Sequence, residues 1–143
     1  MKNKSLLKKI VYSLIIIFVL LLIYFLPFFD LSDKRFFFPI VAILGLLFLI
    51  LGAVLVFMSR KEKGKLKIAL MTTGLSATAP LIFSILHNFF YALAIIFEGL
   101  KFLFEALHAI SFIIALLIAP LVFIIGAIIS LILLKGKVTG KKS

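Results

Sequence analysis

Four long apolar segments limit what this chain can fold into. A helix needs about 20 apolar residues to cross the hydrocarbon core of a bilayer. The segments at 10–29, 36–58, 66–97 and 109–134 all reach that length. Barrel strands that face lipid alternate polar and apolar residues, and none of these segments alternates. The pattern therefore predicts an all-α membrane protein, a single domain over 1–143 with four transmembrane helices.

The composition supports this prediction. Of the 143 residues 65% are hydrophobic and 15% are charged, whereas soluble domains average about 45–50% apolar and about 25% charged residues. There is no cysteine, which excludes disulfides and thiolate metal sites. The first segment follows four lysines, as a signal peptide does, but its apolar stretch exceeds about 15 residues and no small-residue cleavage site follows it. We expect it to be retained as a span.

The basic residues predict the orientation. Thirteen of the sixteen lysines and arginines lie before the first segment, in the stretch 60–67 in and just after the loop that follows the second segment, or in the tail at 135–143. Basic loops stay in the cytoplasm, so we expect a protein of the cell (inner, cytoplasmic) membrane with both termini cytoplasmic. No basic cluster is longer than a loop or tail. The expected partner is therefore the lipid bilayer and not nucleic acid.

The loops between the segments are short, which predicts antiparallel neighbours in one four-helix bundle. Between the third and fourth segments, the polar residues Glu98, Lys101, Glu105 and His108 follow one another at steps of three, four and three. On a helix they share one face, which predicts a short amphipathic segment on the outer surface. Lys101 and Glu105 are spaced for an i,i+4 ion pair.

Small residues and prolines indicate where the helices pack. Helices in lipid associate where small residues let the backbones approach. Pro80 and Pro120 interrupt the third and fourth segments at similar depth, and each weakens its helix. The candidate packing positions are Gly45, Gly52, Gly74, Pro80, Pro120 and Gly126.

The third segment carries a polar seam. At about 100° per residue, its polar side chains fall within an arc of roughly 80°, with Asn88 at the edge. The members of the seam are Thr73, Ser76, Ser84, His87, Asn88, Tyr91 and Glu98. Two interpretations stay open. Such groups bond helices together, or they line a ligand or ion path, because ionisable groups inside membranes are costly and often functional.

A metal site is a further alternative. Glu105 and His108 have the Glu-x-x-His spacing seen in carboxylate-bridged metal bundles, and His87 and Glu98 could approach them from the third segment. Such bundles need several motifs of this kind, and the sequence has one. We therefore expect no cofactor.

The stretch 76–91 contains a Leu-His-Asn-aromatic run, Leu86 to Phe89, after a small-residue segment. Together with 119–128 it resembles the corresponding stretches in a group of small prokaryotic four-span membrane proteins with no assigned activity. The resemblance covers about the C-terminal half. It implies the same topology, directs attention to His87 and Asn88, and supplies no activity.

The sequence holds no catalytic constellation. The leading hypothesis is a non-enzymatic accessory or regulatory component that acts through helix–helix contacts, with a membrane protein or a second copy as partner. The alternative is a small transporter or channel with a polar path along the third segment. A membrane metal protein or enzyme is the third hypothesis.

Overall fold

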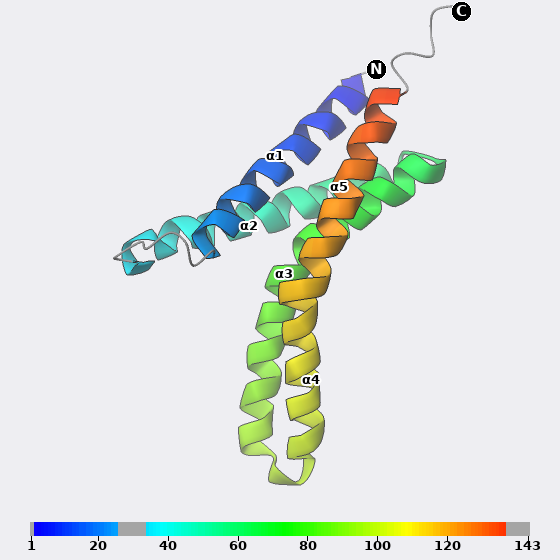
Figure 1. Ribbon diagram of the computed structural model, residues 1–143. Helices are drawn as coiled ribbons and strands as arrows, with labels where there is room; N and C mark the ends of the chain where they lie inside the picture. The colour runs from blue at the N-terminus through cyan, green and yellow to red at the C-terminus, as the bar shows by residue number, and fades with distance from the viewer. Residues whose placement is uncertain (1, 26–33, 137–143) are drawn as a thin grey trace, which may run out of the picture.

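The computed structural model describes residues 2–25 and 34–136, and the part of the chain that it describes is helical (Figure 1). The elements in chain order are α1 (Lys2–Phe25), α2 (Lys34–Ser59), α3 (Gly64–Ile96), the 3-10 turn η1 (Glu98–Leu100), α4 (Lys101–Ile113), the π-helical turn η2 (Ile114–Ile118) and α5 (Ala119–Gly136). Four stretches are long and apolar enough to cross a membrane: Lys4–Tyr24, Phe37–Ser59, Gly64–Ile96 and Glu98–Gly136. The prediction of an all-helical chain with four such helices is confirmed.

The predicted boundaries can be compared with these helices. The second and third segments, 36–58 and 66–97, agree with α2 and α3 to within two residues. Positions 26–29 of the first segment and 137–143 of the tail lie outside the described residues. The fourth helix starts earlier than expected, because no glycine or proline interrupts the chain from Lys101 to Ala119. The expected outer segment is therefore continuous with the fourth helix.

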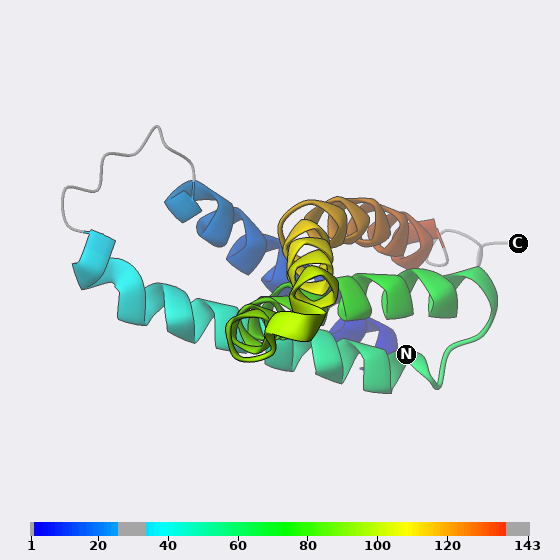
Figure 2. The ribbon, with the colours of Figure 1, turned by 90° about the horizontal axis from the view of Figure 1, so that it is seen from below.

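Helix α3 is the centre of the molecule. It packs against α2, α4 and α5, while α1 packs against α2 and α5. Helices α1 and α2, the first half of α3 (64–79) and α5 form one unit, which we call the body. The second half of α3 with η1 and α4 (80–113) forms an antiparallel pair, the hairpin, which projects from the body (Figure 1) and is seen end-on in Figure 2. The four helices thus do not run side by side over their whole length.

The apolar core lies within the body. Its buried members come from all four body helices and include Leu7, Leu14, Leu55, Leu70 and Phe123. Phe123 contacts two more rings, with centroid distances of 4.8 Å to Phe18 and 5.0 Å to Phe48. Aromatic pairs in such geometries contribute about 0.5–1.5 kcal/mol beyond the area they bury. These three rings join α1, α2 and α5.

Two glycines bring α2 and α3 together. A Cβ built on Gly74 would lie 2.7 Å from the backbone oxygen of Gly52, and a Cβ on Gly52 would lie 2.8 Å from that of Gly74. At Gly126 of α5, a Cβ would lie 2.9 Å from Thr73 Oγ1. At Gly45, by contrast, a Cβ would meet no described atom within 4 Å. The first half of α2 diverges from α3 (Figure 1).

Pro80 and Pro120, the two prolines expected to weaken their helices, lie where the body meets the hairpin. Pro80 lies inside α3, where it cannot donate a backbone hydrogen bond, and α3 bends as it leaves the body (Figure 2). On the opposite helix, the Ala119 N–H donates to the carbonyl of Ile114, five residues back, immediately before Pro120. A π-type turn next to a proline is a recognised cause of helix bending.

Candidate functional site

The seam residues in the body are buried and bonded. Thr73 is 0% exposed, and its hydroxyl donates to the Ala69 carbonyl at 2.8 Å. Ser130 Oγ lies 3.0 Å from Thr73 Oγ1. The single hydroxyl hydrogen of Thr73 is already donated to Ala69, so Ser130 is the donor in that second bond. Ser76 donates to the Thr72 carbonyl at 2.7 Å. This part of the seam joins α3 to α5.

The seam residues in the hairpin are placed differently. Ser84 and Asn88 are exposed, and Asn88 Nδ2 donates to the Ser84 carbonyl at 2.9 Å. An asparagine amide has two donor hydrogens and an acceptor oxygen. Within residues 34–136, no partner is recorded for the second hydrogen or the oxygen of Asn88. These groups can therefore bond another chain.

The most specific arrangement in the hairpin is a pair of histidines, His87 of α3 and His108 of α4. Their rings stack with centroids 3.8 Å apart and an angle of 23° between the planes. His87 Nδ1 lies 3.2 Å from the backbone oxygen of His108, and His108 Nδ1 lies 3.0 Å from the backbone oxygen of His87. Each imidazole thus bonds the backbone of the other helix.

These bonds fix the tautomer of both rings. A carbonyl oxygen only accepts hydrogen bonds, so each Nδ1 must carry a hydrogen. In the neutral imidazole the other nitrogen, Nε2, then has a free lone pair. The rings of Phe112 and Tyr91 flank the pair, at centroid distances of 5.3 Å from His87 and His108 respectively. The pair joins α3 to α4 at a level where no other described side-chain hydrogen bond does.

The charged residues gather at the tip of the hairpin. Lys101 Nζ lies 3.9 Å from Glu105 Oε1, which confirms the expected i,i+4 pair. An open recess of about 350 Å³ there is lined by Tyr91, Ala94, Ile95, Glu98, Lys101 and Glu105. In the described part of the chain, no three His, Cys, Asp or Glu side chains are grouped so as to hold a metal ion. The alternative metal residues Glu105 and His108 thus lack, among the described residues, the further ligands that a site would need.

The spacing of the two histidines in the sequence is a signal for their contact. His87 and His108 lie ten residues before and eleven residues after Phe97, the residue that follows α3. In an antiparallel hairpin, positions equally far from the turn lie at the same level. The hydrogen bond between Thr73 and Ser130 has no comparable signal in the sequence, because it depends on how α3 and α5 are rotated about their own axes.

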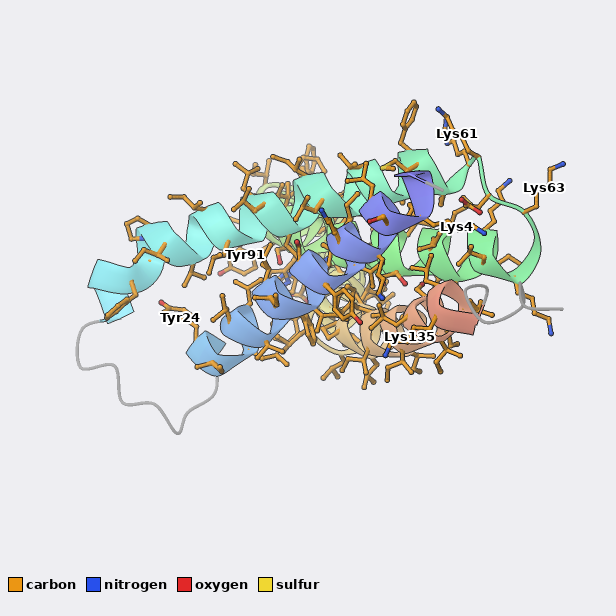
Figure 3. All side chains as sticks on the ribbon, turned by 90° about the horizontal axis from the view of Figure 1, so that it is seen from above. Lys4, Tyr24, Lys61, Lys63, Tyr91 and Lys135 are labelled. Atoms are coloured by element: carbon orange, nitrogen blue, oxygen red, sulfur yellow. The ribbon has the colours of Figure 1, made fainter. Side chains whose placement is uncertain are left out.

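Several lysines of the body gather at one end of it, away from the hairpin tip. Lys4, Lys61, Lys63 and Lys135 lie at one end of the body, whereas Tyr24 lies at the other end of α1 (Figure 3). These lysines come from three separate parts of the sequence: the start of α1, the loop after α2 and the end of α5. The basic segments, which were predicted to lie on the same side of the membrane, therefore lie together at one end of the body.

Comparisons with known proteins add no function to this geometry. No protein-family model, no curated protein and no solved structure matches the chain. The resemblance of the stretch 76–91 to small four-span membrane proteins therefore stays a prediction. The function has to be argued from the arrangement of the chain's own residues.

Proposed function

We propose that this chain is a non-enzymatic accessory or regulatory membrane protein that packs its hairpin against a transmembrane helix of another protein. The observation that carries the proposal is the isolation of the hairpin. Helix α4 packs mainly against α3, and the pair projects away from the body (Figure 1). Most of the large apolar side chains of the hairpin are exposed, including Ile85 and Phe89 of α3 and Phe102 of α4.

A narrow stripe on α3 is the expected contact. Ser84, Asn88 and Ala92 are all exposed and follow one another at steps of four, so they lie on one face of the helix. Ser84 and Ala92 are small, which lets a second helix approach closely. Between them, the unused hydrogen and oxygen of the Asn88 amide can bond that helix. We call these three residues the stripe.

The depth of Asn88 makes lipid a poor neighbour for it. Asn88 lies ten residues from Glu98 at the charged tip, which is about 15 Å along a helix. The hydrocarbon core is about 30 Å thick, so a tip at the membrane surface places Asn88 near mid-depth. Lipid chains offer an amide no hydrogen bond. A helix that presents a polar side chain at this level would satisfy it.

The alternative functions receive less support. A transport path along α3 would need free polar groups over the length of the seam, but Thr73 and Ser76 donate to carbonyls of their own helix. A metal enzyme would need more ligands than the described residues group together. Partner binding uses the groups that are left without partners.

Crosslinking inside native membranes tests the proposal. A photoreactive benzophenone amino acid at position 92 places the probe on the stripe, and the same residue at the exposed position 43 of α2 is the matched control. We expect a discrete adduct with one other protein from position 92, none from position 43, and a weaker adduct when Asn88→Leu is added.

Three outcomes would contradict the proposal. An adduct at twice the mass of the chain, with no other protein, would assign the stripe to a second copy. Equal yields from positions 92 and 43, or a chain that elutes alone as a monomer from native membranes in mild detergent, would show that the stripe has no specific partner. Circular dichroism of the N88L variant establishes that the helices still form.

A further inference from the structure

An open groove runs along the body between α3 and α5. Its volume is about 360 Å³, at the lower end of the range of about 300–1,000 Å³ for small-molecule sites. The lining residues are Lys65, Ile68, Ala69, Thr72, Val122, Ile125, Gly126 and Ile129. This groove lies in the body, away from the hairpin and the stripe, so it is independent of the proposed function.

The floor and the walls of the groove differ in size. Ala69 and Gly126 are buried and form the floor, whereas Ile68 is 66% exposed and Ile125 is 59% exposed and they form the walls. Both helices contribute residues at the spacing i, i+3, i+4 and i+7, which is one helix face. The result is a slot whose sides are branched aliphatic chains. Its shape and chemistry suit a flexible hydrocarbon chain.

The surface of the groove is almost entirely apolar, and one polar residue of α3 lies at each end of it. On α3, Lys65 lies at one end and Thr72 at the other, seven residues or about 10 Å apart along the helix. Lys65 is exposed and belongs to the basic end of the body, with Lys61 and Lys63 in the preceding loop. Glu62 is the one acid in the stretch 60–67. A ligand whose hydrocarbon chain lies in the slot would therefore place its polar end against positive charge.

We propose that this groove binds one anionic phospholipid of the surrounding bilayer, with an acyl chain between Ile68 and Ile125 and the phosphate at Lys65. Three observations support the occupant: the aliphatic slot, its opening on an exposed apolar surface of a helix long enough to cross a membrane, and a lysine at the basic end. Basic residues near a membrane surface attract anionic headgroups with about 1 kcal/mol each. Charge complementarity thus selects an anionic lipid over a zwitterionic one.

Native mass spectrometry of the full chain in detergent tests the site, with phosphatidylglycerol as the anionic probe and phosphatidylcholine as the zwitterionic one. We expect one phosphatidylglycerol to stay bound under conditions that strip phosphatidylcholine. K65Q removes the charge at the groove, and K61Q removes a charge that is also exposed but lies outside the groove. We expect K65Q to weaken phosphatidylglycerol binding about fivefold, the factor that corresponds to about 1 kcal/mol, and K61Q to leave it within twofold.

The contrasting outcomes are distinct. Equal losses in K65Q and K61Q would mean that the basic end attracts anionic lipid without a site, and equal retention of both lipids by the unaltered chain would remove the selectivity. Inorganic phosphate that displaces phosphatidylglycerol at millimolar concentration would show that the acyl slot contributes nothing. Any of these results overturns the proposal. None bears on the partner helix of the stripe.

Discussion

At the residue scale, α3 is joined to α5 by a bond between two side chains and to α4 by bonds from side chains to the backbone. Thr73 and Ser130 share one hydrogen bond between their hydroxyls. His87 and His108 make two bonds, and each ring bonds the backbone carbonyl of the other residue. A substitution keeps the backbone carbonyl but removes the side chain. The two contacts should therefore respond differently to paired substitutions.

Substitutions at Thr73 and Ser130 are expected to have non-additive effects on the free energy of unfolding. Thr73→Val or Ser130→Ala alone removes their shared bond, so the double variant loses no further bond. We expect a coupling energy of about 0.6 kcal/mol, the average for hydrogen bonds between membrane helices. The free energy of unfolding in mixed micelles, measured for the four chains of the cycle, checks this value. A coupling of zero would mean that the two hydroxyls do not bond each other.

Substitutions of His87 and His108 by Phe are expected to have additive effects on the free energy of unfolding. Phe keeps a ring for stacking, and residue 87 of His87→Phe still offers its carbonyl to His108. Each single variant should lose one bond, about 1 kcal/mol, and the double variant should lose both. The same unfolding assay measures the three variants. Nitrogen chemical shifts of labelled histidine give an independent check, since both rings should carry hydrogen on Nδ1; hydrogen on Nε2 instead would contradict the reciprocal bonds.

At the element scale, the crossing of α2 and α3 depends on two glycines that leave no room for a methyl group. Gly74→Ala would put a Cβ 2.7 Å from the Gly52 backbone oxygen, and the backbone cannot yield as a side chain can. We expect a loss of about 1–3 kcal/mol of unfolding free energy, the usual cost of overpacking. Unfolding of the purified chain in detergent measures it.

Gly45→Ala is the matched control, on the same helix as Gly52. No described atom lies within 4 Å of its Cβ position, so the added methyl group meets no steric cost. Alanine is a better helix former than glycine by roughly 0.5–1 kcal/mol, so this variant should be as stable as the unaltered chain or slightly more stable. Equal losses from Gly74→Ala and Gly45→Ala would mean that the crossing is not close-packed.

The sequence predicts the helices better than their contacts. Apolar length defined α2 and α3 to within two residues, because a helix that crosses lipid needs a minimum span. Composition could not separate Gly45 from Gly52, since both are small residues in the same apolar helix. Which glycine meets another helix depends on where α2 diverges, and that is a property of the packing. For the same reason, the sequence listed the polar seam but could not divide it into a buried part at Thr73 and an exposed part at Asn88.

At the scale of the whole molecule, the sequence predicted one bundle, and the structure has a body with a projecting hairpin (Figure 1). Short loops require neighbouring helices to be antiparallel, but they do not require helices to stay together over their length. Pro80 and the π turn before Pro120 lie at the junction, where each helix can change direction. The prolines were recognised in the sequence; the size and direction of a bend are set by tertiary contacts.

The shape also separates charge. The basic end of the body and the tip of the hairpin, with Glu98, Lys101 and Glu105, lie at opposite extremes of the molecule (Figures 1 and 3). Because basic segments stay in the cytoplasm, we expect the basic end inside the cell and the hairpin tip outside. The absence of cysteine makes this testable with single introduced thiols. Ser5→Cys and Lys61→Cys lie at the basic end, and Gly99→Cys lies at the tip.

A membrane-impermeant maleimide applied to intact cells should label Gly99→Cys and leave the other two variants unlabelled until the membrane is permeabilised. Gly99 is a mild position for this test, since no described atom lies within 4 Å of its Cβ position. The unaltered chain, with no thiol, is the background control. Labelling of Lys61→Cys from outside would reverse the orientation. Different accessibility at positions 5 and 61 would contradict the shared end itself, because α1 and α2 would then not both cross the membrane.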